Sequence, residues 1–213
     1  MANIRVGVLA SGRGTDFQSL VDARDRKELS ADIAILICNV PGAPVLELAK
    51  KAGVRAVVVD HRPYGKDREG FERAVVKILR EDRVDLVVLA GFMRLVSSYF
   101  LREFPMRVMN IHPSLLPAFP GVHAHRDALA AGVKVSGCTI HFVDTSVDGG
   151  PVILQRAVAV LEDDTEETLS ARILEQEHII LPIAVRLFAE GRLRVEGRRV
   201  RIRTTGLHLP PMA

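Results

Sequence analysis

The sequence has no tryptophan, two tyrosines and only two cysteines among its 213 residues. Cys38 and Cys138 both lie within apolar runs, so we expect reduced thiols in the core rather than a disulfide or a nucleophile. No apolar run approaches the roughly 20 residues needed to cross a bilayer, and the N-terminus leads directly into a short strand without a signal-type segment. We therefore expect a cytoplasmic protein with no membrane partner.

A net positive charge is also lacking outside one segment near the C-terminus. The net charge is +3, yet residues 192–203 alone hold six arginines against Glu196, so the remainder of the chain is slightly acidic. Nucleic-acid binding would need basic residues spread along a face together with aromatic residues for stacking, so we expect no nucleic-acid partner. Apolar residues alternate with arginines on both sides of Glu196 and Gly197, which predicts a small, solvated C-terminal hairpin.

The order of apolar and amphipathic segments indicates an α/β fold. Short runs rich in Val and Ile alternate with segments of helical spacing, which predicts a mostly parallel, doubly wound sheet of about seven strands with helices on both faces. The expected parallel strands are 4–10, 33–38, 56–59, 86–90 and 108–111. Three helices are expected between them: the first begins at residue 13 or 14, the second covers 43–52 and the third covers 67–81.

The second half of the chain predicts an antiparallel pair. Segments 136–143 and 151–160 are strand-like and are joined by a polar turn, and a last helix follows from 164–166 to 189. After the hairpin, residues 210–213 are expected to form a loose tail. Because no linker, repeat or low-complexity tract interrupts the chain, residues 1–213 are predicted to form a single domain.

The run from Val108 to Gly121 carries the most informative chemistry. Asn110 and His112 lie two residues apart, so both side chains project to the same face at the carboxyl end of the expected strand. Three prolines then restrict the loop that follows. An amide donor beside a titratable imidazole suits a reaction in which negative charge develops on a carbonyl oxygen while a proton moves at neutral pH. The pair therefore indicates acyl transfer.

Residues 11–16, Ser-Gly-Arg-Gly-Thr-Asp, form a glycine-rich turn between the first strand and the first helix. Backbone amides at such a turn and at a helix N-terminus can hold an anion. Phe17 breaks the full dinucleotide pattern, and there is no lysine of the P-loop kind, so a nicotinamide or a nucleoside triphosphate is disfavoured. A single bound phosphate and a plain strand-to-helix turn both stand as interpretations.

A third segment, Asp148-Gly-Gly-Pro, lies on the turn between the two antiparallel strands. By itself it is a hairpin turn, but a carboxylate that reached His112 would favour the imidazolium form and leave a proton available for transfer. The histidines at 112, 123, 125 and 141, with Asp148, could also be interpreted as metal ligands. They lack a compact ligand motif, so we expect no metal.

Further motifs accompany these segments and extend along most of the chain. They are Pro-Ser-Leu-Leu-Pro at 113–117, Ala-Gly-Phe-Met-Arg at 90–94, Pro-Gly-Val-His-Ala-His-Arg at 120–126, His-Phe-Val at 141–143, Gly-Gly-Pro-Val-Ile-Leu-Gln at 149–155 and Gln-Glu-His at 176–178. With Asn110, His112 and Asp148, they make the chain resemble the folate-dependent formyltransferases. The resemblance implies transfer of a formyl group from the co-substrate 10-formyltetrahydrofolate to the amine of 5-phosphoribosylglycinamide, a step of de novo purine biosynthesis.

The same resemblance implies a role for each matching residue. Asn110 would hold the formyl oxygen, His112 would donate a proton and stabilise the oxyanion, and Asp148 would support the histidine, without a covalent intermediate or a metal. The implied folate-binding residues are Arg68, Met93, Arg94, Leu95, Val96, Asn110, Asp144 and Asp148. The implied residues for the phosphoribosyl substrate are Gly14, Thr15, Asp16, Gln176 and Glu177. The Leu116-Pro117 bond is a candidate cis peptide. The domain would divide into a nucleotide-phosphate half at 1–110, a folate and catalytic half at 111–190, and the hairpin and tail at 191–213.

One departure from the family pattern concerns the phosphate turn, which usually reads Ser-Gly-x-Gly-Ser-Asn. Thr15 and Asp16 stand at its last two positions, and a carboxylate beside a phosphate should repel it. Asp16 could instead cap the first helix, with Arg13 offsetting its charge. The alternatives to the implied activity are a formyltransferase with another acceptor, such as methionyl-tRNA, a formyltetrahydrofolate hydrolase, and a non-catalytic folate- or nucleotide-binding module. A homodimer is an open alternative to a monomer.

Overall fold

The computed structural model describes residues 3–205, and within them nine strands form a single sheet in the order β3-β2-β1-β4-β5-β6-β7-β9-β8. The strands are β1 (Ile4–Ala10), β2 (Ala31–Cys38), β3 (Ala56–Val58), β4 (Leu86–Leu89), β5 (Val108–His112), β6 (Val135–Phe142), β7 (Val152–Ala159), β8 (Leu193–Glu196) and β9 (Arg199–Ile202). The helices are α1 (Thr15–Asp25), α2 (Val45–Lys51), α3 (Arg68–Glu81), α4 (Ser98–Glu103), α5 (Ala124–Ala130) and α6 (Glu166–Ala189), with a short 3-10 turn η1 at Arg62–Tyr64. The α/β fold class is confirmed. His208 and the tail at 210–213 lie outside the described residues.

The sheet has a parallel part, β3 to β5, and a mixed part, β6 to β8, in which strand direction reverses at β5/β6, β6/β7 and β9/β8. Strands β1 to β5 are parallel, and β6 and β7 pair antiparallel, as expected. The prediction of about seven strands was too low, because β9 of the C-terminal hairpin pairs with the edge strand β7 between Val152 and Arg199. An edge strand presents unpaired backbone groups, and the hairpin extends the sheet by pairing with β7 at its first residue.

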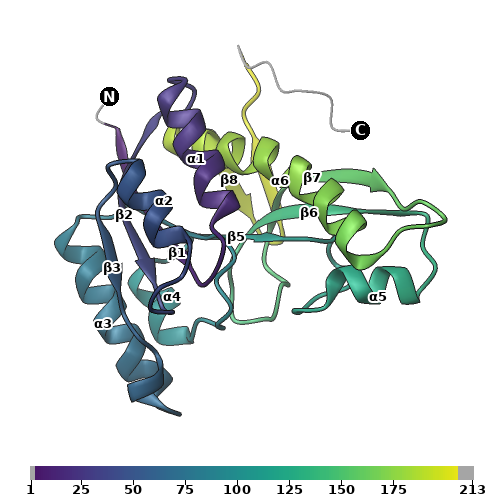
Figure 1. The fold of residues 1–213 in the computed structure, drawn as a ribbon. Helices are drawn as coiled ribbons and strands as arrows, with labels where there is room; N and C mark the ends of the chain where they lie inside the picture. The colour runs from purple at the N-terminus through teal and green to yellow at the C-terminus, as the bar shows by residue number, and fades with distance from the viewer. Residues whose placement is uncertain (1–2, 206–213) are drawn as a thin grey trace.

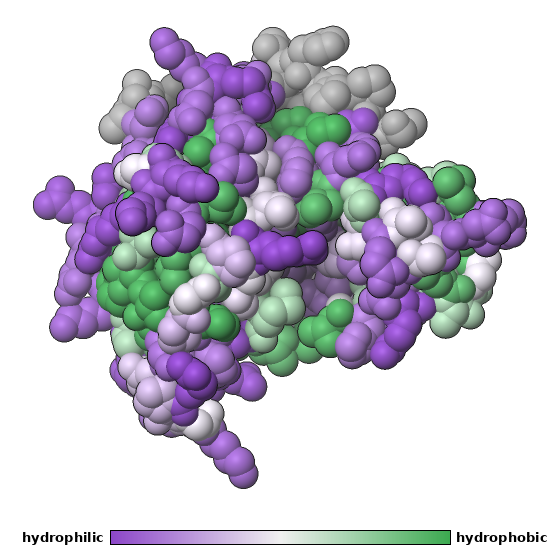
Figure 2. Space-filling model, in the orientation of Figure 1, coloured by the Kyte–Doolittle hydropathy of each residue, from purple (hydrophilic) through white to green (hydrophobic). Residues whose placement is uncertain are grey.

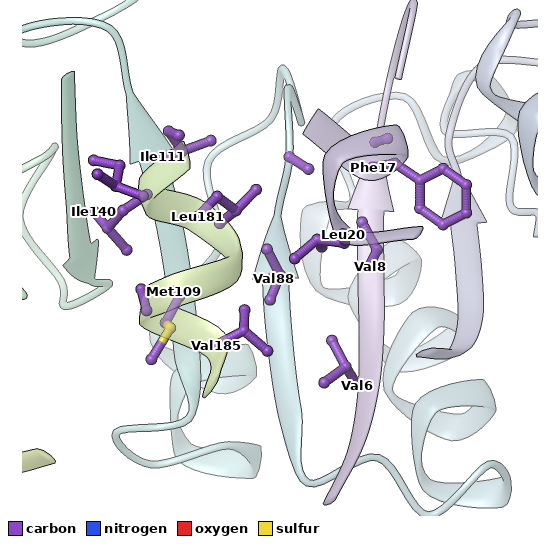
Figure 3. Close-up of a cluster of buried hydrophobic side chains, with 14 of the residues drawn as sticks. Val6, Val8, Phe17, Leu20, Val88, Met109, Ile111, Ile140, Leu181 and Val185 are labelled. Carbon is purple, nitrogen blue, oxygen red and sulfur yellow. The ribbon is translucent and has the colours of Figure 1, made fainter. Parts of the chain in front are cut away.

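Two apolar layers cover the sheet, one on each face (Figure 1). Val8 of β1 belongs to the layer under α1 and α6, whereas its neighbour Leu9 belongs to the layer under α3. This alternation follows from the two-residue period of a strand. Figure 3 shows the first layer, in which Leu20 of α1 and Leu181 of α6 approach the same sheet face.

Local sequence signals explain where the longer helices begin. The Asp67 carboxylate accepts a hydrogen bond from the backbone N–H of Gly70 at the start of α3, and Thr165 and Thr168 cap α6 reciprocally. Helices α4 and α5, with six and seven residues, were not predicted. Fewer than two helical turns give too few positions for an apolar period to appear in the sequence.

The topology determines where a site can form. Strand β1 is flanked by β2 on one side and by β4 on the other. From β1 the chain builds β2 and β3 towards one edge of the sheet, and it then crosses back to add β4 and β5 on the other side of β1. At such a switch point, the loops that follow neighbouring parallel strands separate and leave a crevice at their carboxyl ends. On the face shown in Figure 2, hydrophilic residues surround several apolar patches. No helix within residues 3–205 is long and apolar enough to cross a membrane.

Candidate functional site

A hollow of about 300 Å³ lies at the carboxyl ends of β4 and β5. Its walls come from three segments: the loop after β4, the end of β5 with the loop that follows, and the turn after β6. Every residue that the sequence predicted for folate lines it, namely Arg68, Met93, Arg94, Leu95, Val96, Asn110, Asp144 and Asp148. Met93, Leu95, Val122 and Val147 are large exposed apolar residues that also line the hollow. An apolar hollow with a few converging polar groups is typical of a small-molecule site.

Asn110 and His112 both line this hollow, as the strand period predicted. The residue between them, Ile111, belongs to the apolar layer that contacts α6. The His112 ring is buried, with 4% of the residue exposed. Its Nε2 donates to the carbonyl oxygen of Phe119 at 2.8 Å, and its Nδ1 lies 3.4 Å from Oδ2 of Asp148. Because both ring nitrogens face oxygen acceptors, only a doubly protonated ring can donate to both.

Asp148 reaches His112 from a turn with an unusual backbone. Its φ is +50°, a left-handed conformation that aspartate tolerates better than most residues. The backbone N–H of Gly121 donates to Asp148 Oδ2 at 2.8 Å. The turn also needs Gly150, because a Cβ there would lie 1.8 Å from the carbonyl oxygen of Phe142. The loop after β5 and the turn after β6 are therefore joined through this carboxylate.

His141 also lines this hollow, although the sequence predicted it only as a possible metal ligand. It lies opposite Asn110 in the antiparallel pairing of β5 and β6. Burial lowers the pKa of His141 below its ordinary 6.5, so the ring is neutral. Its Nδ1 then donates to the carbonyl oxygen of Phe142 at 3.0 Å, and its Nε2 accepts from the Asn110 amide at 3.2 Å. This contact fixes the Asn110 amide and leaves its second N–H for the hollow.

The proline-rich loop after His112 is held from below by a buried polar network. Thr139 donates to the carbonyl oxygen of Ser114 at 2.6 Å and accepts from the backbone N–H of Leu116 at 3.1 Å. Gln155 donates to the carbonyl oxygen of Leu116 at 2.9 Å. The Leu116-Pro117 peptide is cis, which confirms the prediction. Loop polar groups that are satisfied in this way stay in one conformation.

The opposite wall, from residue 91 to 97, is held by a buried carboxylate. Glu72 of α3 is 2% exposed and accepts hydrogen bonds from both the backbone N–H of Ser97, at 2.7 Å, and its hydroxyl. The hydroxyl of Ser11 accepts from the N–H of Met93 at 2.9 Å, and the Arg94 guanidinium lies over the Phe71 ring. None of these contacts has a local sequence signal, since each joins segments that are distant in the chain.

A second hollow, of about 370 Å³, lies at the turn between β1 and α1. Gly14, Thr15, Asp16 and Glu177 line it, as predicted, whereas Gln176 is not among its lining residues. Gly14 is the N-cap of α1 with φ +80°, and a Cβ there would lie 2.4 Å from the Val45 side chain, so glycine is required. The two hollows share Gly91, Met93, Ile111 and Pro113 as lining residues and therefore adjoin.

Asp16 does not cap α1, so that expectation was wrong. It lies inside the first turn of the helix, which has no side-chain capping bond, and it is 9% exposed. Burial raises the pKa of Asp16 from 3.8 to about 6, partly opposed by the charge of Arg13. Glu177 of α6 is 7% exposed, and burial together with the Asp16 charge raises its pKa well above 4.5. Two buried carboxyl groups thus act on each other at this hollow.

The remaining sequence expectations concern metal ligands and thiols. Within residues 3–205, no group of three or more His, Cys, Asp and Glu side chains is arranged to hold a metal ion. His125 lines the second hollow, whereas His112, His141 and Asp148 line the first. Cys38 and Cys138 are free and buried, as expected, and burial raises the pKa of both thiols.

Comparison with known proteins agrees with this arrangement. A family model described as formyl transferase matches residues 4–185. Phosphoribosylglycinamide formyltransferase of Escherichia coli (strain K12) is 38% identical over 208 residues, which are 98% of this chain and 97% of that protein. The crystal structure of glycinamide ribonucleotide transformylase 1 from Symbiobacterium toebii is 53% identical, covers 94% of each chain and superposes with a TM-score of 0.92.

The chain also matches part of a much longer protein. It is 44% identical to the trifunctional purine biosynthetic protein adenosine-3 of Gallus gallus over 192 residues, which are 90% of this chain but only 19% of that protein's length. The family match and the extent of these similarities give the same assignment. The chain belongs to the formyl transferase family.

Proposed function

We propose that this protein transfers the formyl group of 10-formyltetrahydrofolate to the amine of 5-phosphoribosylglycinamide, in the cytoplasm and in the purine biosynthetic pathway. The observation that carries the proposal is the junction of the two hollows. The first presents apolar walls and the trio Asn110, His112 and Asp148, and the second presents the glycine-rich turn and the N-terminus of α1. A folate in one and a phosphoribosyl group in the other would place formyl donor and amine acceptor together at the shared wall.

The second hollow suits the phosphate end of the acceptor. The first backbone N–H groups of α1 have no partner within the helix, and the helix dipole favours an anion there. In the proposal, Gly14, Thr15 and Asp16 hold the phosphate through backbone amides, and Glu177 contacts the ribose hydroxyls. The apolar residues Met93, Leu95 and Val96 form the walls for the pterin ring together with the loop from Asp144 to Asp148, and Arg68 contacts the glutamate end of the folate.

The chemistry follows from where charge develops. The neutral amine attacks the formyl carbon, and the carbonyl electron pair moves to oxygen to give a tetrahedral intermediate. Asn110 donates one hydrogen bond to this oxyanion. In the proposal, His112 donates a second from Nε2, which gives up its contact with the Phe119 carbonyl, while Asp148 at Nδ1 stabilises the positive charge on the imidazolium. His112 gives its proton to the folate nitrogen, the oxyanion electron pair re-forms the C=O bond, and the C–N bond to folate breaks. The proton lost by the attacking amine replaces the one that His112 gave. The products are N-formylated substrate and tetrahydrofolate.

The test is a formyl transfer assay with the purified protein. 10-Formyltetrahydrofolate is mixed with 5-phosphoribosylglycinamide, the folate absorbance is followed, and a parallel reaction lacks the acceptor. We expect turnover only when the acceptor is present. Turnover without the acceptor would identify a hydrolase, and no turnover in either reaction would favour another acceptor or a binding module. The division into halves at 1–110 and 111–190 is a prediction that accompanies this proposal, and a homodimer stays an alternative to a monomer.

A further inference from the structure

Two carboxyl groups face the second hollow from different helices. Asp16 comes from the first turn of α1 and Glu177 from the middle of α6, and both line the cavity that begins at the glycine-rich turn. Both are more than nine-tenths buried. The Oδ1 atom of Asp16 has no hydrogen-bond partner among the described residues. The structure therefore provides donors for the phosphate at this turn but none for the Asp16 oxygen beside it.

The groups around Asp16 do not supply a full counter-charge. Arg13, exposed in the turn before α1, lowers the pKa of Asp16, but less than burial raises it. His178 of α6 has its Nε2 at 3.9 Å from Asp16 Oδ1, and burial lowers the pKa of this histidine. His125 of α5 lines the hollow with its pKa also lowered by burial, and Cys138 of β6 is a buried thiol. The imidazoles are thus held towards their neutral forms.

Two buried carboxylates that line one hollow and act on each other through their charges cannot both ionise without an electrostatic penalty. One proton on the pair removes that penalty. A phosphate dianion that entered the turn would add a second and a third negative charge to the same low-dielectric region, so the penalty for leaving both carboxyls ionised would rise further.

We propose that Asp16 and Glu177 form an electrostatically coupled pair that holds at least one proton while the phosphate-bearing substrate is bound, so that binding takes up a proton from solution wherever the free pair is ionised. This makes Asp16 a specificity-determining residue of the site. The inference rests on the proposed function for the identity of the substrate. The pair in its protonated form accepts the phosphate, whereas the fully ionised pair repels it. Binding should therefore weaken by up to about tenfold per pH unit above the pH at which the free pair loses its shared proton.

The test is calorimetric titration of 5-phosphoribosylglycinamide into the protein without folate, between pH 7 and 8.5, in two buffers with different ionisation heats. Above pH 7 the phosphate is essentially dianionic, since its second pKa is about 6. For the wild-type protein we expect the observed heat to depend on the buffer by an amount close to one proton. For Asp16→Asn we expect that proton to disappear and the affinity to depend less on pH. The titration of the substrate's own amine is common to both proteins and cancels in the comparison.

Two further variants separate the alternatives. Asp25→Asn changes an exposed aspartate at the far end of α1 and should behave as the wild type. Glu177→Gln removes the other partner and should also lose the proton, so the test stands even where Asp16→Asn does not fold. Binding with equal proton uptake in the wild type and both pair variants would overturn the inference while leaving the proposed function intact. Absence of binding in every protein would overturn the proposed function, and the inference with it.

Discussion

Asp148 and Asp16 are both largely buried aspartates at the site, yet their carboxylates have very different surroundings. Asp148 Oδ2 accepts from the N–H of Gly121 at 2.8 Å and lies 3.4 Å from His112 Nδ1. Within residues 3–205, Asp16 Oδ1 has no hydrogen-bond partner, and His178 Nε2 lies 3.9 Å from it. The chain supplies a donor and an imidazole to one carboxylate and leaves the other to be neutralised by a proton.

The difference shows that residue type alone does not assign a role at this site. Asp148 sits on a turn, where backbone amides from a neighbouring loop are free to approach it. Asp16 sits inside a helix whose neighbours are the side chains of another helix, and those side chains include a second acid. A paired carboxylate stays charged and can act on a neighbouring imidazole, whereas an unpaired buried one favours its protonated form. The same Asp→Asn substitution should therefore have opposite consequences at the two positions.

Asp148→Asn should have the largest effect on activity. Asparagine preserves the shape of the side chain and can still accept from Gly121, but it removes the negative charge beside His112. Since positioned proton transfer typically contributes about 10²- to 10⁴-fold, we expect turnover with 5-phosphoribosylglycinamide to fall by at least about 100-fold. Steady-state kinetics measure this, and His123→Ala, at an exposed histidine outside both hollows, is the matched control. Turnover within threefold of wild type would remove Asp148 from the mechanism.

Asp16→Asn should instead stabilise the ligand-free protein at neutral and alkaline pH. The folded-state pKa of Asp16, about 6, lies above its usual 3.8. The folded state therefore holds a proton that the unfolded state has lost, and the stability contributed by this carboxyl is complete below about pH 4 and is lost as pH rises through about 6. The difference between the two pKa values corresponds to about 3 kcal/mol.

Urea unfolding of wild type and Asp16→Asn at pH 4.5 and pH 8 measures this difference. The two proteins should be closer in stability at pH 4.5 than at pH 8, where the variant should gain. Asp25→Asn serves as the control for removing a negative charge from α1. An equal gain in the free energy of unfolding at both pH values would mean that titration of Asp16 does not contribute to the gain. Packing of the new side chain would then account for the higher stability.

The features of this site that the sequence predicted depend on short-range geometry. Asn110 and His112 share a face because residues two apart in a strand always do, and Gly14 lies at the turn because a positive φ favours glycine. His141 and Glu72 were missed for the opposite reason. His141 contacts Asn110 across a strand pairing that joins positions 31 residues apart, and Glu72 reaches Ser97 from a different element, 25 residues away.

The prediction for Asp16 was wrong for the same reason, because its surroundings depend on residues that are distant in the chain. The sequence placed it correctly at the turn but predicted a helix cap, because an aspartate near a helix start commonly caps it. The register of the chain makes Gly14 the cap, and the packing of α1 on α6 brings Asp16 to Glu177. That contact depends on helix packing between segments far apart in the chain, which no local pattern encodes. The nine-stranded sheet was missed for a similar reason, since pairing of β9 with β7 is a tertiary contact.

Glu72→Gln should have a smaller effect, on binding rather than on turnover. Glutamine can keep one acceptor for the N–H of Ser97 but loses the charge that strengthens both bonds. The wall at 91–97 should then be less well ordered, so we expect KM for 10-formyltetrahydrofolate to rise about fivefold with little change in kcat. Glu69→Gln, on the exposed face of the same helix, is the control. A fall in kcat with unchanged KM would show that Glu72 acts on the reacting groups instead of on the wall.

Arg198→Ala should have the smallest effect, and it tests how far the support of Asp148 extends. Arg198 lies in the C-terminal hairpin and donates to the carbonyl oxygen of Gly149, the residue after Asp148, at 2.9 Å. An exposed side chain in a single such contact contributes less than about 1 kcal/mol, so kcat/KM should fall by no more than about fivefold. Arg194→Ala, an exposed arginine on the same hairpin, should leave kcat/KM unchanged. Equal values for the two variants would restrict the support of Asp148 to Gly121 and His112, whereas a loss specific to Arg198 would add the hairpin to the structure that holds the turn carrying Asp148.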